Sequence, residues 1–277
     1  MQSVTSDMKR RYQEHGSRRF SADGLAMGLA FQGQTAKDSA LNPSLQNINA
    51  GSYGVTEAFS PAKTELEGSN GYSREANRFY LAAKRSGDVL AAAGALVVLL
   101  PLLAGIALMI RAEGPGPVLY CQERVGREGR RFKFYKFRSM VLNADAIKAQ
   151  YMKLNEASGP IFKMKNDPRV TAIGRVLRRY SLDELPQFWN VLIGDMSLVG
   201  PRTHLPSEVA QYQKDQEARL LVQPGLICLR EVSGRSHLSF EQWVELDLAY
   251  IKSRSLGKDL SILLKAVPAI LKADGAF

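Results

Sequence analysis

The sequence predicts an α+β fold that is mainly helical, with a re-entrant membrane helix hairpin and a short β-hairpin. The first observation is an uninterrupted apolar run at 89–110, without a charged or strongly polar side chain. The second is a pair of short alternating segments on either side of Gly126 and Gly129. The third is helical spacing of apolar residues at 185–192 and again at 258–271.

Composition narrows the class of partner. The 277 residues include 37 Lys and Arg against 27 Asp and Glu, a formal net charge of +10, so anionic partners are expected. Nucleic acid, an acidic lipid surface and phosphorylated substrates all stay open on charge alone. The two cysteines, Cys121 and Cys228, have neither Cys-x-x-Cys nor Cys-His ligand spacing. This argues against a zinc site or a disulfide framework and fits a reducing compartment.

Residues 1–72 are predicted to form a disordered N-terminal tail. They are rich in Ser, Gly, Gln, Asn and Ala, show no sustained period, and are punctuated by turn formers such as Asn42-Pro43 and Ser60-Pro61. The basic residues near the N-terminus are not followed by an apolar stretch, so no cleavable signal peptide is expected there.

Residues 73–111 are predicted to form an amphipathic lead-in and a re-entrant membrane helix. As a straight helix the apolar run would reach roughly 33 Å, the thickness of a bilayer core; a buried helix of a soluble core is the alternative. Pro101 lies near its middle and is expected to kink it. Positive charge flanks both ends, at Lys84 and Arg111, so the positive-inside bias does not favour passing one end across. A helix that enters, bends at Pro101 and returns is therefore preferred over a spanning one.

A short β-hairpin is predicted next. The Gly and Pro residues at 114–117 end the helix, and 118–123 and 131–137 have the pattern of two strands. The surrounding segment 111–140 carries eight Lys and Arg against three Glu. Most of these charges are interpreted as a face beside anionic headgroups, worth about 1 kcal/mol each, and some as phosphate-binding side chains.

The stretch 178–202 holds the most informative pattern. Its apolar residues at i, i+3, i+4 and i+7 predict an amphipathic helix, and Ser181 and Glu184 match a capping box that starts the helix at Ser181. Asp183 then falls in the first turn, where the helix dipole favours a carboxylate by about 0.3–1 kcal/mol, so it is expected to be ionised. Capping alone explains Ser181 and Glu184 as a structural alternative. Phosphoryl transfer, however, requires a nucleophile and cations that neutralise the phosphate oxygens, and an ionised aspartate near several arginines can supply both.

Further motifs occur in order along the chain. They are Lys84-Arg85-x-x-Asp88, Gln122-x-Arg124-x-Gly126, the segments 134–140, 181–190 and 194–202, Pro224-Gly225, the segment 232–235, and Glu245-x-Asp247. With this series the chain from about Arg85 onward resembles the bacterial sugar transferase family, the monotopic polyprenyl-phosphate hexose-1-phosphate transferases or phosphoglycosyl transferases.

The resemblance implies a two-step reaction. Asp183 would be the nucleophile that displaces UMP from a UDP-sugar and holds the sugar phosphate covalently. Undecaprenyl (polyprenyl) phosphate would then attack that intermediate, with Glu184 as a base or an orienting group. Mg²⁺ would lie against Asp183 and the diphosphate. The resemblance also implies a membrane hairpin bent at a proline, in agreement with Pro101.

Several basic residues are candidates for binding substrate phosphates. Arg202 of the Gly-Pro-Arg motif is the strongest; the others are Arg178, Arg138, Lys136 and Arg235. Two motif acids, Asp195 and Asp247, stay open between bracing and function. The sequence departs from the family pattern at Thr203, where many members have proline, and at Arg230-Glu231, where many have Trp-Gln or Ala-Gln. The second departure leaves the preference for sugar or nucleotide open.

Residues 112–277 are predicted to form a cytoplasmic catalytic domain that ends in an interfacial helix. The helix at 258–271 has a broad apolar face bordered by lysines, which suits a helix lying on a membrane. An ordinary packing helix or a homo-oligomer contact is the alternative.

The function that the resemblance implies is initiation of exopolysaccharide, capsule or O-antigen repeat-unit synthesis at the inner (cytoplasmic) membrane. The expected partners are a UDP-sugar, polyprenyl phosphate and membrane lipids. Nucleic acid is not expected, because the basic residues border the membrane segment. A catalytically silent membrane scaffold is the alternative, and the joint presence of Asp183, Glu184 and Arg202 argues against it.

Overall fold

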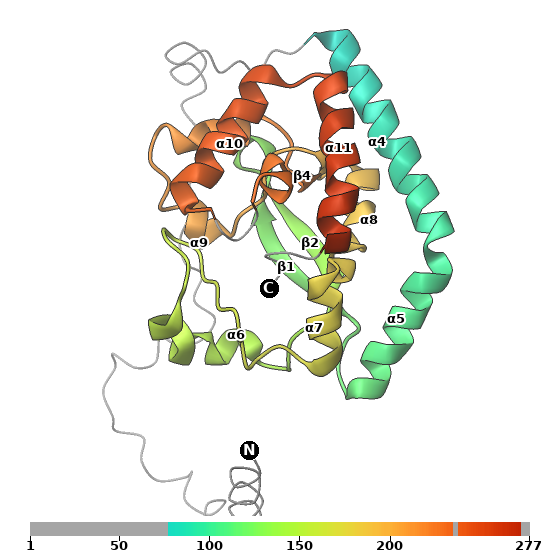
Figure 1. Ribbon diagram of the computed structural model, residues 1–277, viewed down its shortest axis with the longest axis vertical. Coiled ribbons are helices and arrows are strands. Elements are labelled where there is room, and N and C mark those ends of the chain that lie inside the picture. Colours follow the sequence, from blue (N-terminus) through green and yellow to red (C-terminus); the bar gives the residue numbers. More distant parts are fainter. Residues whose placement is uncertain (1–76, 235–237, 273–277) are drawn as a thin grey trace, which may run out of the picture. The chain divides into compact units, whose positions relative to one another are not determined.

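The computed structural model describes residues 77–234 and 238–272 (Figure 1). The described part is mainly helical, as predicted, and it contains two small two-stranded sheets, of which one is the predicted β-hairpin. The predicted disordered tail, residues 1–72, lies outside the described residues. The helices are α4 (Arg78–Val98), α5 (Leu100–Glu113), α6 (Ala144–Ile147), α7 (Ala172–Arg179), α8 (Gln187–Ile193), α9 (Pro206–Val209), α10 (Phe240–Ser253) and α11 (Leu256–Lys272). The strands are β1 (Leu119–Val125), β2 (Arg131–Phe137), β3 (Ser197–Val199) and β4 (Gly225–Ile227).

Helices α4 and α5 follow one another with a bend of 60° between them. Helix α4 begins after Asn77, whose side-chain oxygen accepts a hydrogen bond of 2.9 Å from the backbone N–H of Phe79. The break lies at Leu99, and Pro101 occupies the first turn of α5. Proline has no N–H to donate and suits the first turn of a helix, so it interrupts what would otherwise be one long helix. The bend therefore lies beside the proline that the sequence singled out.

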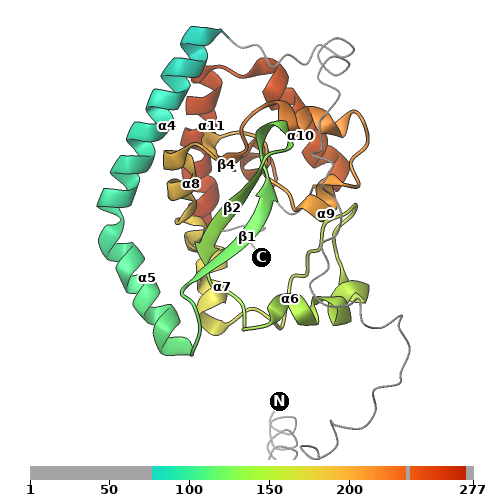
Figure 2. The ribbon, with the colours of Figure 1, turned by 180° about the vertical axis from the view of Figure 1, so that it is seen from behind.

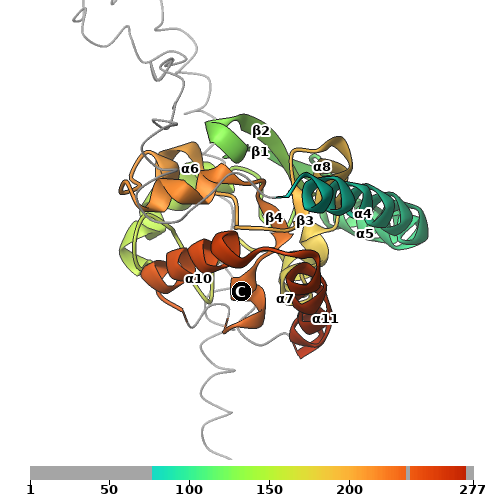
Figure 3. The ribbon, with the colours of Figure 1, turned by 90° about the horizontal axis from the view of Figure 1, so that it is seen from above.

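The bent pair is also long and apolar enough to be a candidate membrane segment. Among residues 77–234 and 238–272, only α4 and α5 taken together have the length and composition that a membrane span requires, and no helix has them alone. Seen from above, the pair runs along one side of the other elements (Figure 3). Large apolar side chains are exposed along it: Leu90, Val97, Val98, Leu100 and Leu108.

Polar contacts attach α4 to the rest of the domain. Asp88, only 5% exposed, accepts hydrogen bonds from the Ser197 hydroxyl at 2.7 Å and from Leu198 N–H at 3.1 Å. One turn earlier, the Arg85 guanidinium donates to two backbone carbonyls in the last turn of α8. The Arg85-x-x-Asp88 motif thus fixes α4 against β3 and α8.

A second contact joins α4 to the C-terminal helices. The buried carboxylate of Asp259 in α11 accepts hydrogen bonds from the Tyr80 hydroxyl at 3.1 Å and the Lys84 ammonium at 2.9 Å, both on α4. It also accepts one of 2.8 Å from the hydroxyl of Tyr250 in α10. Helix α11 covers more residues than the predicted helix at 258–271, and it continues through Pro268.

Strands β1 and β2 form the predicted antiparallel hairpin (Figure 2). Leu119 pairs with Phe137 and Val125 with Arg131. In the connection, Gly129 and Glu128 both have positive φ, +74° and +58°, which Gly adopts at no steric cost. The hairpin is two residues longer at the end of β1 than the sequence pattern indicated.

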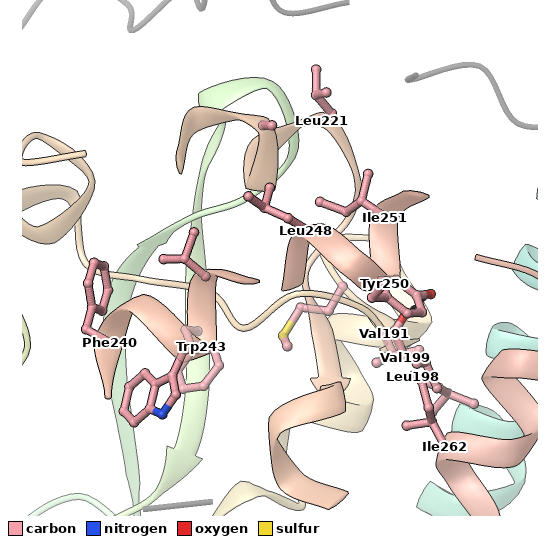
Figure 4. Packing of buried hydrophobic residues seen from close by; sticks show 14 of the residues in the cluster. Val191, Leu198, Val199, Leu221, Phe240, Trp243, Leu248, Tyr250, Ile251 and Ile262 are labelled. Atoms are coloured by element: carbon pink, nitrogen blue, oxygen red, sulfur yellow. Dashed lines mark hydrogen bonds between the residues drawn. The ribbon is translucent and has the colours of Figure 1, made fainter. Parts of the chain in front are cut away.

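Strands β3 and β4 form a parallel pair that the sequence did not predict. The pair lies inside the main hydrophobic cluster, which α8, α10 and α11 complete (Figure 4). The Tyr250 hydroxyl donates to the carbonyl of Val199 at 3.1 Å, which ties α10 to β3. The labelled members of the cluster are Val191, Leu198, Val199, Leu221, Phe240, Trp243, Leu248, Tyr250, Ile251 and Ile262.

Two glycines allow the backbone to cross closely at this pair. A Cβ atom on Gly225 would lie 2.0 Å from the backbone nitrogen of Gly200. We therefore expect Gly225→Ala to destabilise the fold by at least about 1–3 kcal/mol, because two main-chain segments must move apart. Thermal unfolding of the detergent-solubilised protein measures this. Gly257→Ala is the control, since its Cβ would enter open space at the start of α11. Equal unfolding midpoints for the two variants would contradict the expectation.

The predicted helix start at Ser181 is wrong. Ser181 has a left-handed backbone, with φ of +55°, and within the described residues its side chain caps no helix. A single 3-10 turn follows at Leu182–Glu184, and α8 begins only at Gln187. Pro186 has no N–H for a helical hydrogen bond and therefore marks the beginning of a new helix. Asp183 thus lies in a tight turn between α7 and α8.

Candidate active site

A cavity of about 410 Å³ opens beside this turn. One side is formed by the end of α7 and the turn with Asp183 and Glu184, and another by β2 through Lys136. The segment after β3 contributes Arg202, and the loop at 161–164 contributes a further wall. Residues far apart in the sequence thus meet around one aspartate.

Asp183 is 5% exposed and lines the cavity. The ammonium nitrogen of Lys136 lies 4.0 Å from its Oδ2. Burial raises the pKa of the Asp183 carboxyl above its ordinary value, and the charge of Lys136 opposes that shift. An ammonium group on β2 therefore favours the charged form of Asp183. The sequence had predicted that an α-helix N-terminus would do so, but Asp183 lies in a 3-10 turn.

Glu184 and Arg202 form an ion pair at the same site. The Nη2 atom of Arg202 lies 2.9 Å from Glu184, and its Nη1 atom lies 3.2 Å from Glu231. Burial alone would raise the pKa of Glu184, but Arg202 and Lys136 outweigh it and hold the pKa below its ordinary value. The two carboxylates, Glu184 first, raise the pKa of Arg202. Arg202 is thus a permanent cation held in one orientation.

Lys136 and Arg178 also line the cavity. The Nε atom of Arg178 donates a hydrogen bond of 3.0 Å to the Ser139 hydroxyl, which leaves the guanidinium directed by a neutral partner. Burial lowers the pKa of both cations, while Asp183 acts in the opposite direction. Buried cations of this kind gain from a bound anion.

Arg138 is not among the described residues that line the cavity. Arg138 donates to the backbone carbonyls of Ile110, Gly114 and Pro115, and so fixes the end of α5 and the turn after it. Arg138 therefore braces this turn, and its expected phosphate contact stays a prediction. Arg235 lies outside the described residues.

The motif acids Asp195 and Asp247 lie away from the cavity lining. Asp195 accepts a hydrogen bond of 3.2 Å from the Asn190 side chain and braces the turn after α8. Asp247 is buried, and the guanidinium of Arg219 donates to it through Nε at 3.0 Å and through Nη2 at 2.5 Å. Both acids therefore have structural partners.

The departures from the family pattern also find partners. Thr203 donates its hydroxyl to the carbonyl of Val125 at 2.8 Å, so it joins the segment after β3 to the end of β1. Glu231 bridges Arg202 to Arg230, whose guanidinium lies 2.6 Å from Glu231 and 4.3 Å from the ring centre of Trp243. Neighbouring cations overcome the effect of burial and lower the pKa of Glu231 to about 2. The exchanged pair is thus part of the cavity wall.

Several cavity residues were missed by sequence reasoning. Lys163 lies outside the basic segment at 111–140. Asp167 and Arg169 form a buried ion pair of 2.6 Å within a segment of irregular structure. His204 follows the Gly-Pro-Arg motif and is also buried. The proximity of Arg202 to His204 was the only signal in the sequence that bears on any of them.

The residues around Asp183 are compatible with a magnesium ion shared with a substrate. In the described part of the chain, no three His, Cys, Asp or Glu side chains come together as a ligand set. Asp183 and Glu184 nevertheless line the same cavity, and the second is engaged by Arg202. Because Mg²⁺ is commonly held by one or two carboxylates together with phosphates and water, this donor set suits an ion completed by a bound diphosphate.

Comparison with known proteins places the chain in a family. Residues 79–273 match the family described as bacterial sugar transferase, and the chain belongs to it. It is 39% identical over 239 residues to the UDP-galactose-lipid carrier transferase of Erwinia amylovora, covering 85% of this chain and 49% of that protein.

Two further relatives agree. The undecaprenyl-phosphate galactose phosphotransferase of Salmonella typhimurium is 37% identical over 243 residues, 85% of this chain and 49% of that protein. The exopolysaccharide production protein ExoY of Rhizobium meliloti is 39% identical over 199 residues, 70% of this chain and 88% of that protein. The chain thus spans about half the length of the first two relatives and most of the third.

Proposed function

We propose that this protein transfers a hexose 1-phosphate from a UDP-sugar to undecaprenyl phosphate, the first step in building an exopolysaccharide, capsule or O-antigen repeat unit. The observation that supports this best is a buried aspartate in a cavity lined by Lys136, Arg178 and Arg202. A cationic cavity suits a diphosphate, and a carboxylate is a competent nucleophile towards phosphorus. The names of the relatives point to the same donor and acceptor.

In the first step, a carboxylate oxygen of Asp183 attacks the phosphorus that carries the sugar. A bond forms between that oxygen and the phosphorus, the bond to the bridging oxygen breaks, and UMP leaves with the electron pair. Lys136 lies beside the attacking carboxylate, and Arg202 is a fixed cation for the phosphate oxygens. Glu184 acts as the orienting group, because it already holds Arg202 at 2.9 Å.

In the second step, an oxygen of the lipid phosphate attacks the same phosphorus. The new phosphorus–oxygen bond forms as the bond to Asp183 breaks, and the carboxylate takes the electron pair and is regenerated. The product is a lipid diphosphate sugar. Asp183, with the substrate phosphates, would hold Mg²⁺, which supplies charge neutralisation when bound.

The bent pair α4 and α5 is proposed to enter the cytoplasmic leaflet and return to the same side. Its support is the 60° bend at the break, the exposed apolar side chains, and the basic residues on both flanks. Helix α11 adds a second apolar surface, on which Leu264 is 66% exposed and Leu260, Val267 and Leu271 are exposed as well. Such a helix suits the membrane interface and would hold the cavity near the lipid headgroups.

The proposal is tested with the purified full chain in detergent, undecaprenyl phosphate, Mg²⁺ and a panel of UDP-sugars. We expect release of UMP together with a lipid-linked sugar diphosphate for at least one donor. Thin-layer chromatography of the lipid fraction and mass spectrometry identify the sugar. Absence of turnover with every donor, from protein that still binds membranes, would support a silent scaffold in place of an enzyme.

The pH profile offers a separate prediction. Asp183 must be ionised to attack, and Lys136 lowers its pKa. Lys136→Met removes that charge while the burial remains, so the acid limb of kcat/KM is expected to move to higher pH. Lys133→Met on the exposed side of the same strand is the matched control. Initial rates of UMP release over the acid pH range give the acid limb for the wild type and for each variant. Coincident acid limbs for the wild type and Lys136→Met would contradict the role of Lys136.

A further inference from the structure

The cavity carries an excess of positive charge. Among the described residues that line it, seven are Lys or Arg and five are Asp or Glu. Such an excess in a partly buried cavity favours an anionic ligand. The question is where along the cavity wall each phosphate of a substrate would be held.

The guanidinium of Arg202 separates two groups of charges. On one side, its Nη2 atom contacts Glu184, next to Asp183 and Lys136. On the other side, its Nη1 atom contacts Glu231, which also binds Arg230. A diphosphate that contacts Arg202 thus has one group of charges near the nucleophile and another away from it.

Lys163 belongs to the second group, on a wall that is held firmly in place. Its backbone N–H donates to the side-chain oxygen of Asn155 at 2.8 Å, and its carbonyl accepts from the N–H of Glu156 at 2.8 Å. The same loop is tied to α10, because the Ser158 hydroxyl accepts a hydrogen bond of 2.9 Å from Phe240 N–H. The Lys163 side chain therefore starts from a fixed point on the cavity wall.

The surroundings of Lys163 disfavour its charge. Burial, followed by the cations Arg230 and Arg202, lowers the pKa of Lys163 to about 8, while Glu231 and Glu156 act in the opposite direction. A phosphate bound beside it would reverse this balance and restore the charged form.

We infer that Lys163 is a further substrate-binding residue, which binds the phosphate lying across the transferred phosphoryl group from Asp183. This rests on the proposed function. In an in-line displacement, the leaving group departs on the side opposite the nucleophile. That position holds the phosphate of UMP in the first step, and the lipid phosphate must attack from the same side in the second. One cationic position would therefore serve the two substrates in turn.

Direct binding tests this without relying on turnover. The full chain in detergent is titrated by calorimetry with UMP and, separately, with a short-chain polyprenyl phosphate. Lys163→Gln is expected to raise both dissociation constants by about ten- to a hundredfold, the range for one lost hydrogen bond to a charged group. Lys163→Arg should stay near the wild type. Lys165→Gln, exposed on the same loop and outside the cavity lining, is the matched control.

The pH dependence gives a second readout. The affinity of the wild type for UMP should fall as the pH rises through about 8, because Lys163 loses its proton in the free protein. The charged groups that act on Lys163 are Arg230, Arg202, Glu231 and Glu156. The Lys163→Arg variant should lack the transition. Unchanged binding of both ligands by Lys163→Gln would overturn the inference, and weakened UMP binding alone would overturn the shared position. A wild type that binds neither ligand would instead count against the proposed function.

Discussion

Asp183→Asn is expected to abolish turnover, lowering kcat by about 10³-fold or more, as the loss of a nucleophile does. The amide has nearly the size of the carboxylate, so the buried turn keeps its packing, but it cannot supply an anionic oxygen to phosphorus. Asp183 lines the cavity, and its carboxylate lies 4.0 Å from the ammonium nitrogen of Lys136. The neighbouring Glu184 forms an ion pair with Arg202, which leaves Asp183 as the better placed nucleophile. The rate of UMP release measures the effect.

The proposed covalent intermediate on Asp183 can be detected directly. Without a lipid acceptor, the wild type should release UMP in a burst that matches the amount of enzyme, and the peptide containing Asp183 should gain the mass of a hexose phosphate. Asp183→Asn should show neither the burst nor the adduct. Asp215→Asn, an exposed aspartate outside the cavity lining, should behave as the wild type. Turnover by Asp183→Asn at the wild-type rate would remove Asp183 from the mechanism.

The sequence predicted correctly the two elements whose conformation depends on a few consecutive residues, the bent helix and the β-hairpin. The apolar run and Pro101 predicted a bent helix, and alternation with two glycines predicted the hairpin, because each pattern is complete within a few consecutive residues. The capping box predicted at Ser181 was wrong because the conformation of this segment depends on residues outside the motif. A left-handed serine and the following Pro186 divide the segment, and a four-residue motif does not report how the preceding helix α7 ends.

Side-chain direction limited the prediction of the site. Lys136 and Arg138 are two residues apart in one basic cluster, yet the first lines the cavity and the second binds carbonyls at the end of α5. Lys163 and Arg202 meet at the cavity only through the tertiary fold. Charge counts along the chain indicate an anionic ligand, but they do not assign the phosphate contacts to particular residues.

The second large effect is expected at the buried ion pair between Arg219 and Asp247. Both side chains are at most 3% exposed. Asp247→Ala leaves the guanidinium buried without its carboxylate, so we expect a loss of about 3–5 kcal/mol in the free energy of unfolding. Thermal unfolding in detergent measures it, with Glu245→Ala on the exposed side of the same helix as the control.

A double variant separates the cost of an orphaned charge from the value of the pair. Replacing both residues, as Arg219→Met with Asp247→Leu, removes the buried charges together, and such replacements are often neutral or stabilising. Here we expect only partial recovery relative to Asp247→Ala. Arg219 also donates to the Tyr212 hydroxyl at 2.9 Å, so this hydroxyl loses a partner in the double variant. If the double variant lost as much stability as the two single losses added together, the ion pair would not be what couples these sites.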